Sequence, residues 1–142
     1  MKGSAKGRYG LQLMVELALQ SGRGPAGVEA IAEAQGLPPK FLRVLLGPLK
    51  AAGLVRVQRG PSGGCLLARH PSLISALEVI EALEGRLGAA SPDAGGLPGA
   101  QVVRELWSSS TEAARAVLRA TSLAELADRQ RALEVDSHGY SI

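Results

Sequence analysis

Residues 28–49 of this 142-residue chain, VEAIAEAQGLPPKFLRVLLGPL, have the pattern of two short helices joined by a tight turn. Ala32 provides a small side chain where the two helices must approach each other. Gly36 follows four residues later, where a turn with positive φ is easiest without a Cβ atom. Apolar side chains pack the pair together: Ile31, Leu37, Leu42 and Leu45. The spacing predicts a helix-turn-helix, although Ala32 and Gly36 by themselves also fit an ordinary helical hairpin.

The second helix of this pair has an apolar face and a basic face. It opens at Pro38-Pro39, where the missing N–H of proline does no harm. At helical spacing the apolar face holds Phe41, Leu42, Leu45, Leu46 and Leu49, and the other face holds Lys40, Arg43, Val44, Gly47 and Lys50. The outer face therefore has three cations and no anion. Such a helix fits the major groove of DNA, with its N-terminal residues nearest the base edges.

A β-hairpin is predicted directly after this helix. Val55 and Val57 alternate with polar residues, residues 60–64 (GPSGG) form a loop, and residues 65–68 (CLLA) return. Arg59 stands at the base of the loop, where it suits a narrow, negative minor groove. The hairpin therefore predicts the wing of a winged helix-turn-helix. Its glycines do not open a helix after a strand, which excludes a nucleotide-binding loop.

Charge is divided unevenly along the chain. Residues 1–70 hold ten Lys and Arg against three acids, a net charge of +7, whereas residues 71–142 hold six bases and ten acids, a net charge of −4. This division indicates that the first half meets a polyanion, although a chance distribution of surface charge would look the same. The basic face, the wing and the charge division agree with one another, and together they favour the helix-turn-helix over the ordinary hairpin.

The remaining segments are predicted to be helical. An amphipathic helix spans residues 7–21. A capping box of Ser75 and Glu78 opens a helix that ends at Gly85, and a second box of Ser122 and Glu125 opens the final helix. Between them lie a flexible loop at residues 86–99, rich in Gly, Pro and Ala, and a long helix at residues 100–120.

Composition excludes several classes of protein. With 46% hydrophobic and 20% charged residues, the chain can bury a core. No apolar run approaches the ~18 residues of a membrane span, and the N-terminus lacks the apolar stretch of a signal peptide. Because Cys65 is the single cysteine, an internal disulfide is excluded. We expect a soluble cytoplasmic protein that has no membrane partner and is not an enzyme, since the sequence has no nucleophile–base arrangement.

Short motifs along nearly the whole chain match a known family. They are residues 6–9 (KGRY), Ile31-Ala32, Gln35-Gly36, Phe41-Leu42, Pro48-Leu49, residues 52–55 (AGLV), Arg59-Gly60, Gly63-Gly64, residues 67–69 (LAR), Val79-Ile80, residues 83–85 (LEG) and residues 123–126 (LAEL). On these residues the chain resembles the winged-helix regulators typified by the iron–sulfur cluster regulator, the nitric-oxide-sensitive repressor and the cysteine-metabolism repressor. The stretch from Gly53 to Arg69 is quite specific.

The resemblance implies a homodimer in which the long helix crosses the partner's equivalent helix, and DNA contacts from the third helix, the wing and the N-terminal segment. The residues expected to contact DNA are Lys2, Lys6, Arg8, Pro39, Lys40, Arg43, Lys50, Arg59, Pro61, Ser62 and Gly63. The residues expected to form the dimer are Val103, Leu106, Trp107, Ala114, Val117 and Leu118. The organisation is then a mainly α fold with a winged helix-turn-helix at 1–85, the loop at 86–99, a helical dimerisation region at 100–135 and a frayed tail at 136–142.

The chain differs from the family pattern at Arg43 and in the loop at residues 86–99. Many members carry an acidic residue at the base-reading position held here by Arg43. Since Arg prefers guanine O6 and N7, whereas a carboxylate accepts from cytosine N4, the target sequence should differ. Many relatives also hold an iron–sulfur cluster on three cysteines in the loop before the long helix, but residues 86–99 contain no Cys and no His. We therefore predict no cluster, metal or cofactor.

Cys65 lies in the wing, where relatives usually have an aromatic residue. The simpler interpretation is an apolar strand residue that faces the core. The alternative is a redox switch, because oxidation within the wing would disturb DNA contact. Trp107 is interpreted as an anchor of the dimer core or of a pocket, rather than as a ligand-stacking residue.

The sequence thus predicts a homodimeric, sequence-specific transcriptional regulator, a repressor that binds double-stranded DNA at a palindromic site. The alternative is a protein-interaction module that keeps the fold and docks to another protein or enzyme. A small effector or a protein partner could enter the space between the helices, and the sequence identifies neither.

Overall fold

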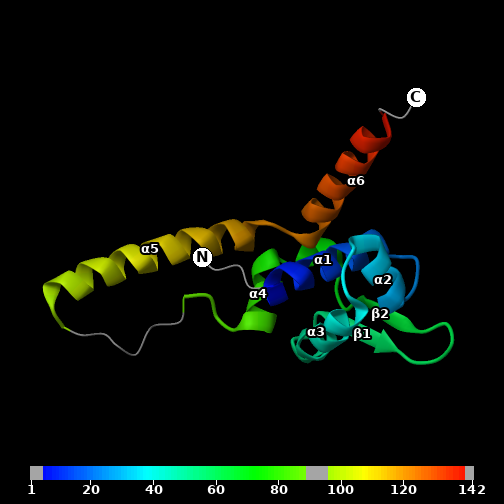
Figure 1. Ribbon diagram of the computed structural model, residues 1–142, viewed down its shortest axis with the longest axis horizontal. Coiled ribbons are helices and arrows are strands. Elements are labelled where there is room, and N and C mark those ends of the chain that lie inside the picture. The colour runs from blue at the N-terminus through cyan, green and yellow to red at the C-terminus, as the bar shows by residue number, and fades with distance from the viewer. Residues whose placement is uncertain (1–4, 89–95, 140–142) are drawn as a thin grey trace.

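The computed structural model describes residues 5–88 and 96–139, and within them the chain is mainly helical (Figure 1). In chain order the elements are α1 (Ala5–Leu19), α2 (Val28–Gln35), α3 (Pro39–Ala51), β1 (Val55–Gln58), β2 (Gly64–Leu67), the short 3₁₀ helix η1 (Pro71–Leu73), α4 (Ala76–Glu84), α5 (Pro98–Ala120) and α6 (Leu123–Gly139). The predicted mainly α fold with one small β-hairpin and a long C-terminal helix is confirmed. No helix within the described ranges is long and apolar enough to span a membrane.

The boundaries of three helices differ from the predicted ones. α1 begins and ends two residues earlier than predicted. α5 begins at Pro98 rather than Ala100, because proline suits the first helical position, so Pro98 and Gly99 leave the predicted loop. α6 continues past Val135 to Gly139. The predictions for Lys2, for residues 89–95 of the loop and for residues 140–142 of the tail lie outside the described residues.

Local signals account for most of the element ends. Gly36 ends α2 with φ 65°, and the N–H of Leu37 donates to the carbonyl oxygen of Ala32 at 2.8 Å. The predicted capping box of Ser75 and Glu78 is confirmed in both directions. At the start of α6, the N–H of Glu125 donates to Ser122 Oγ at 3.1 Å. The chain turns where the sequence places Gly and Ser.

Helix α1 supplies the centre of the core. Leu13, Met14 and Leu17 are buried, and the helix packs against α2, α4 and α6 (Figure 1). Two glycines on α1 allow α4 to come close: Gly7 donates its N–H to Glu84 Oε1 at 3.0 Å, and a Cβ on Gly10 would lie 2.1 Å from Leu83 Cδ1. At Gly10 a side chain would displace the buried Leu83, whereas at Gly7 it would meet the end of the exposed and flexible Glu84.

Helix α5 projects away from this core, whereas α6 begins beside α1 and rises in a different direction (Figure 1). α5 is joined to the body through Arg115, which hydrogen-bonds to Glu81 of α4 and donates to the carbonyl oxygen of Leu87 at 3.3 Å. Gln130 of α6 accepts a hydrogen bond from Gln35 of α2 at 3.3 Å. These links hold both C-terminal helices to the N-terminal body.

Gly10→Ala is expected to lower the free energy of unfolding, because the new methyl group meets Leu83. Overpacking typically costs ~1–3 kcal/mol, which outweighs the ~1 kcal/mol that Ala gains over Gly in a helix. The measurement is urea denaturation of both single variants and of the double variant Gly10→Ala/Leu83→Ala. In the Leu83→Ala background the same change should be neutral or stabilising, and equal losses in the two backgrounds would contradict the contact.

Candidate nucleic-acid interface

Helix α3 presents a basic outer face because its inner face is buried. Leu42, Leu45 and Leu49 have no exposed surface and belong to the core. The predicted contact residues Pro39, Lys40, Arg43 and Lys50 are all exposed on this helix. The structure therefore places them on one accessible surface, as the sequence predicts.

Arg43 has a partner that the sequence did not indicate. Its guanidinium forms an ion pair with the carboxylate of Glu29, in the first turn of α2. Both side chains are exposed, so the pair contributes at most ~1 kcal/mol to stability. The guanidinium has five N–H donors in a planar fork, and one carboxylate leaves donors free for another acceptor. Glu29 thus orients the Arg43 side chain and leaves some of its N–H donors free for another acceptor.

The wing is fixed to α3 and to the segment before α2. After α3, Gly53 adopts φ 73° and Leu54 donates to the carbonyl oxygen of Leu49 at 3.0 Å, which turns the chain into β1. β1 and β2 pair antiparallel with Val57 opposite Cys65. Cys65 also exchanges backbone hydrogen bonds of 2.8 and 2.9 Å with Ala26. Strand β2 is therefore hydrogen-bonded on both of its edges, to β1 on one side and to Ala26 on the other.

The tip of the wing is a tight turn. The N–H of Gly63 donates to the carbonyl oxygen of Gly60 at 3.0 Å, which places Pro61 and Ser62 at the two central positions of a β-turn. A Cβ on Gly63 would lie 2.2 Å from the carbonyl oxygen of Gln58, so only glycine fits there. Pro61, Ser62 and the neighbouring Arg59 are exposed, whereas Gly63 is half-buried.

α3 and the wing lie together on one side of the molecule, at the lower right of Figure 1, and α6 points the opposite way. The two elements that carry most of the predicted contact residues, α3 and the wing, therefore lie on the same side of the molecule. Lys6 and Arg8 are exposed in the first turns of α1, on either side of the buried Gly7.

Arg56, which was not among the predicted contact residues, is also exposed, on β1 between Val55 and Val57. The alternation of polar and apolar residues in β1 is the sequence pattern that indicates this exposure. Arg69 is used differently: it pairs with Glu78 and donates to the carbonyl oxygen of Leu73, which ties the end of β2 to the start of α4.

Along α5 an apolar stripe has no cover from the other residues that the structure describes. None of its residues is buried, and the exposed large side chains are Val102, Val103, Leu106, Trp107 and Val117. The predicted dimer residues Ala114 and Leu118 are half-buried. An uncovered apolar surface of this length is typical of an interaction site.

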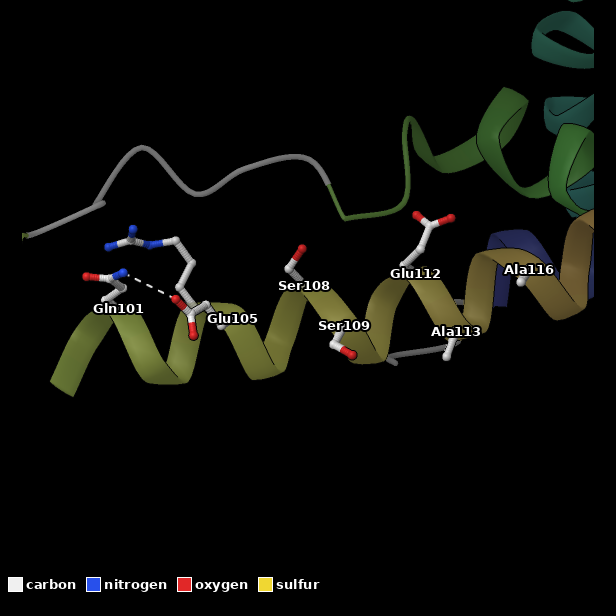
Figure 2. A pocket seen from close by; sticks show the side chains of 8 residues that line it. Gln101, Glu105, Ser108, Ser109, Glu112, Ala113 and Ala116 are labelled. Carbon is white, nitrogen blue, oxygen red and sulfur yellow. Dashed lines mark hydrogen bonds between the residues drawn. The ribbon is translucent and has the colours of Figure 1, made fainter. Parts of the chain in front are cut away.

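A shallow cavity of about 800 Å³ lies on a polar side of α5 (Figure 2). Gln101, Glu105, Ser108 and Glu112 line it, and Gln101 donates to Glu105 at 3.2 Å. All of the lining side chains come from this one helix.

The exposed basic helix and its wing define a winged helix-turn-helix, the architecture of DNA-binding transcription regulators. A family model described as "Rrf2: Iron-dependent Transcriptional regulator" matches residues 3–129. The chain therefore belongs to the Rrf2 family of transcriptional regulators, which are not enzymes.

Individual relatives agree over most of the chain. It is 40% identical over 127 residues to the HTH-type transcriptional regulator CymR of Bacillus subtilis strain 168, covering 89% of this chain and 90% of the relative. It is 35% identical over 138 residues to IscR of Klebsiella pneumoniae strain 342, covering 95% and 85%. The solved structure of CymR, the global cysteine regulator of B. subtilis, matches with a TM-score of 0.81 at 39% identity, covering 91% of this chain and 98% of that one.

The residues of this chain do not fit an iron site of the kind that the family description suggests. Cys65, the one cysteine, is only 3% exposed and packs in the core. Across residues 5–88 and 96–139, no three His, Cys, Asp or Glu side chains come together as a metal site would require. Burial raises the pKa of the Cys65 thiol above its ordinary value of 9.0, which disfavours the thiolate that binds metal or reacts with oxidants.

The alkaline stability of the protein should depend on Cys65. Folding raises the pKa of this thiol, so the folded state favours its protonated form. The thiol therefore makes its full contribution to the free energy of unfolding below about pH 9 and loses it as the pH rises further. Near neutral pH the free energy of unfolding of the wild type should exceed that of Cys65→Ala by roughly 1 kcal/mol. This difference should shrink as the pH rises. Denaturation of both proteins at several pH values measures this difference. Titration of the Tyr and Lys residues affects both proteins equally and cancels in the comparison. A difference that stays constant through ~pH 11 would contradict the buried thiol.

Proposed function

We propose that this protein is a homodimeric, sequence-specific DNA-binding repressor that works without an iron–sulfur cluster. The observation that carries the proposal is the accessible basic face of α3 beside an exposed Arg59 on a tightly held wing. A helix of this kind enters the major groove, and a wing Arg suits the adjacent minor groove. Lys6, Arg8, Lys40 and Lys50 would contact phosphates, and we infer a cytoplasmic location from action on chromosomal DNA.

The uncovered stripe of α5 supports the homodimer. A twofold pairing of this helix would cover Val103, Leu106 and Trp107 and would place two α3 helices on one duplex. The operator should then be palindromic, with half-sites related by the same twofold axis. We also propose repression, because a dimer bound across a promoter would block RNA polymerase.

The proposal includes no cluster because the ligands are missing. A single buried thiol per protomer cannot supply the cysteine set of a typical cluster. Anaerobically purified protein should therefore contain no stoichiometric iron or acid-labile sulfide.

A second candidate is a protein-interaction module, favoured by exposed Leu133 and Val135 near the end of α6. The two candidates differ in their response to salt. A regulator should show sequence-dependent DNA affinity that falls steeply with salt, whereas a docking module should bind only a protein partner.

Purified protein is expected to select specific fragments from the source genome. On the selected site, Arg59→Ala and Arg43→Ala should each weaken binding by ~1–3 kcal/mol, and Arg43→Ala should also relax base preference. Fluorescence anisotropy over a series of salt concentrations is the measurement. The control is Arg129→Ala, which removes an exposed Arg from α6. Equal affinity of all four proteins, or no enrichment of any fragment, would overturn the assignment.

Val103→Glu should dissociate the dimer, because it places an unpaired carboxylate in the proposed interface. A buried unpaired charge costs several kcal/mol, which raises the dimer dissociation constant by about 100-fold or more. Ser108→Glu adds the same charge on the other side of α5 and serves as the control. Analytical ultracentrifugation measures both, with circular dichroism to show that the helices remain. A dimer unaffected by Val103→Glu would place the interface elsewhere.

A further inference from the structure

The outer face of α3 holds one apolar side chain among its cations. Val44 is 65% exposed, and it lies one helical turn from Lys40 and from Gly47. A Cβ atom on Gly47 would have nothing within 4 Å, so the surface beside Val44 is open. The isopropyl group is therefore accessible to a flat partner that approaches α3 from outside.

Exposure of a single apolar residue is common and is not by itself informative. The position of Val44 is what matters, because Arg43 and Lys40 mark the same surface as the one that meets DNA. A β-branched residue also lowers helix propensity slightly, so Val44 contributes little to the stability of α3. In the free protein no contact of the core depends on it.

The major groove has one apolar group at its base edges, the C5 methyl of thymine. We propose that Val44 determines specificity by contacting this methyl group in each half-site of the operator. This inference rests on the proposed function, and it adds an apolar contact to the polar contact of Arg43.

The position of Glu29 supports the recognition of different base pairs by Arg43 and Val44. The ion pair holds the Arg43 guanidinium toward α2, and Val44 is the next residue around the helix. The two side chains therefore approach different base pairs. A guanine for Arg43 near a thymine for Val44 is the pattern that this surface recognises.

The test removes the methyl group from the DNA. Each thymine of the genomically selected operator is replaced by deoxyuridine, one position at a time and in both half-sites together. The affinities of wild type and Val44→Ala are then measured for every site. The matched control is Val135→Ala, which makes the same change at a valine that is 70% exposed on α6, far from α3 (Figure 1).

Wild type and Val135→Ala should each bind about fourfold more weakly, per half-site, when the thymine at one position is replaced. This is the factor expected for one buried methyl group. For Val44→Ala the unmodified operator should already bind more weakly, and the same replacement should have almost no further effect. The role of Val44 is overturned if wild type and Val44→Ala lose equal affinity at every thymine, or if neither loses affinity at any thymine. Specific binding to the operator would persist in both cases. If no operator is selected at all, the proposed function itself fails, and the role of Val44 fails with it.

Discussion

The burial of the inner face of α3 is the constraint on which the rest of this molecule depends. Leu42, Leu45 and Leu49 are held without exposed surface, so the helix cannot rotate without exposing them at a cost of ~1.5–3 kcal/mol each. Their burial leaves Lys40 and Val44 facing outward. It also sets the wing, because the chain turns into β1 through a hydrogen bond to the carbonyl oxygen of Leu49. The surface proposed to meet DNA is therefore determined by packing on its opposite side.

Much of this arrangement could be predicted from the sequence because its signals are local. Gly36 ends α2 and Ser75 caps α4, each by an interaction within a few residues. The ion pair of Glu29 with Arg43 could not be predicted, because both residues are exposed, lie on different helices and have no characteristic spacing. The close approach of α4 to Gly10 was also missed, since a glycine in a helix does not indicate which element packs against it. The roles of individual site residues remain predictions.

Helix α5 combines an attachment to the N-terminal body with an apolar surface that no other described residue covers. Arg115 is mostly buried and connects the helix to Glu81 and Leu87, whereas Val103 and Trp107 are exposed. In the proposed dimer the Arg115 contacts would fix the angle between α5 and the N-terminal body. That angle would set the separation of the two α3 helices, and hence the spacing of the half-sites.

The position of Cys65 bears on how such a regulator could respond to a signal. Its side chain is buried in the core, and its backbone exchanges hydrogen bonds with Ala26 while it pairs with Val57. Oxidation of the sulfur would require β2 to open, and the backbone bonds that hold the wing would be lost in the same event. The protonated thiol disfavours that reaction. Cys65 is thus better suited to maintain the wing than to sense an oxidant.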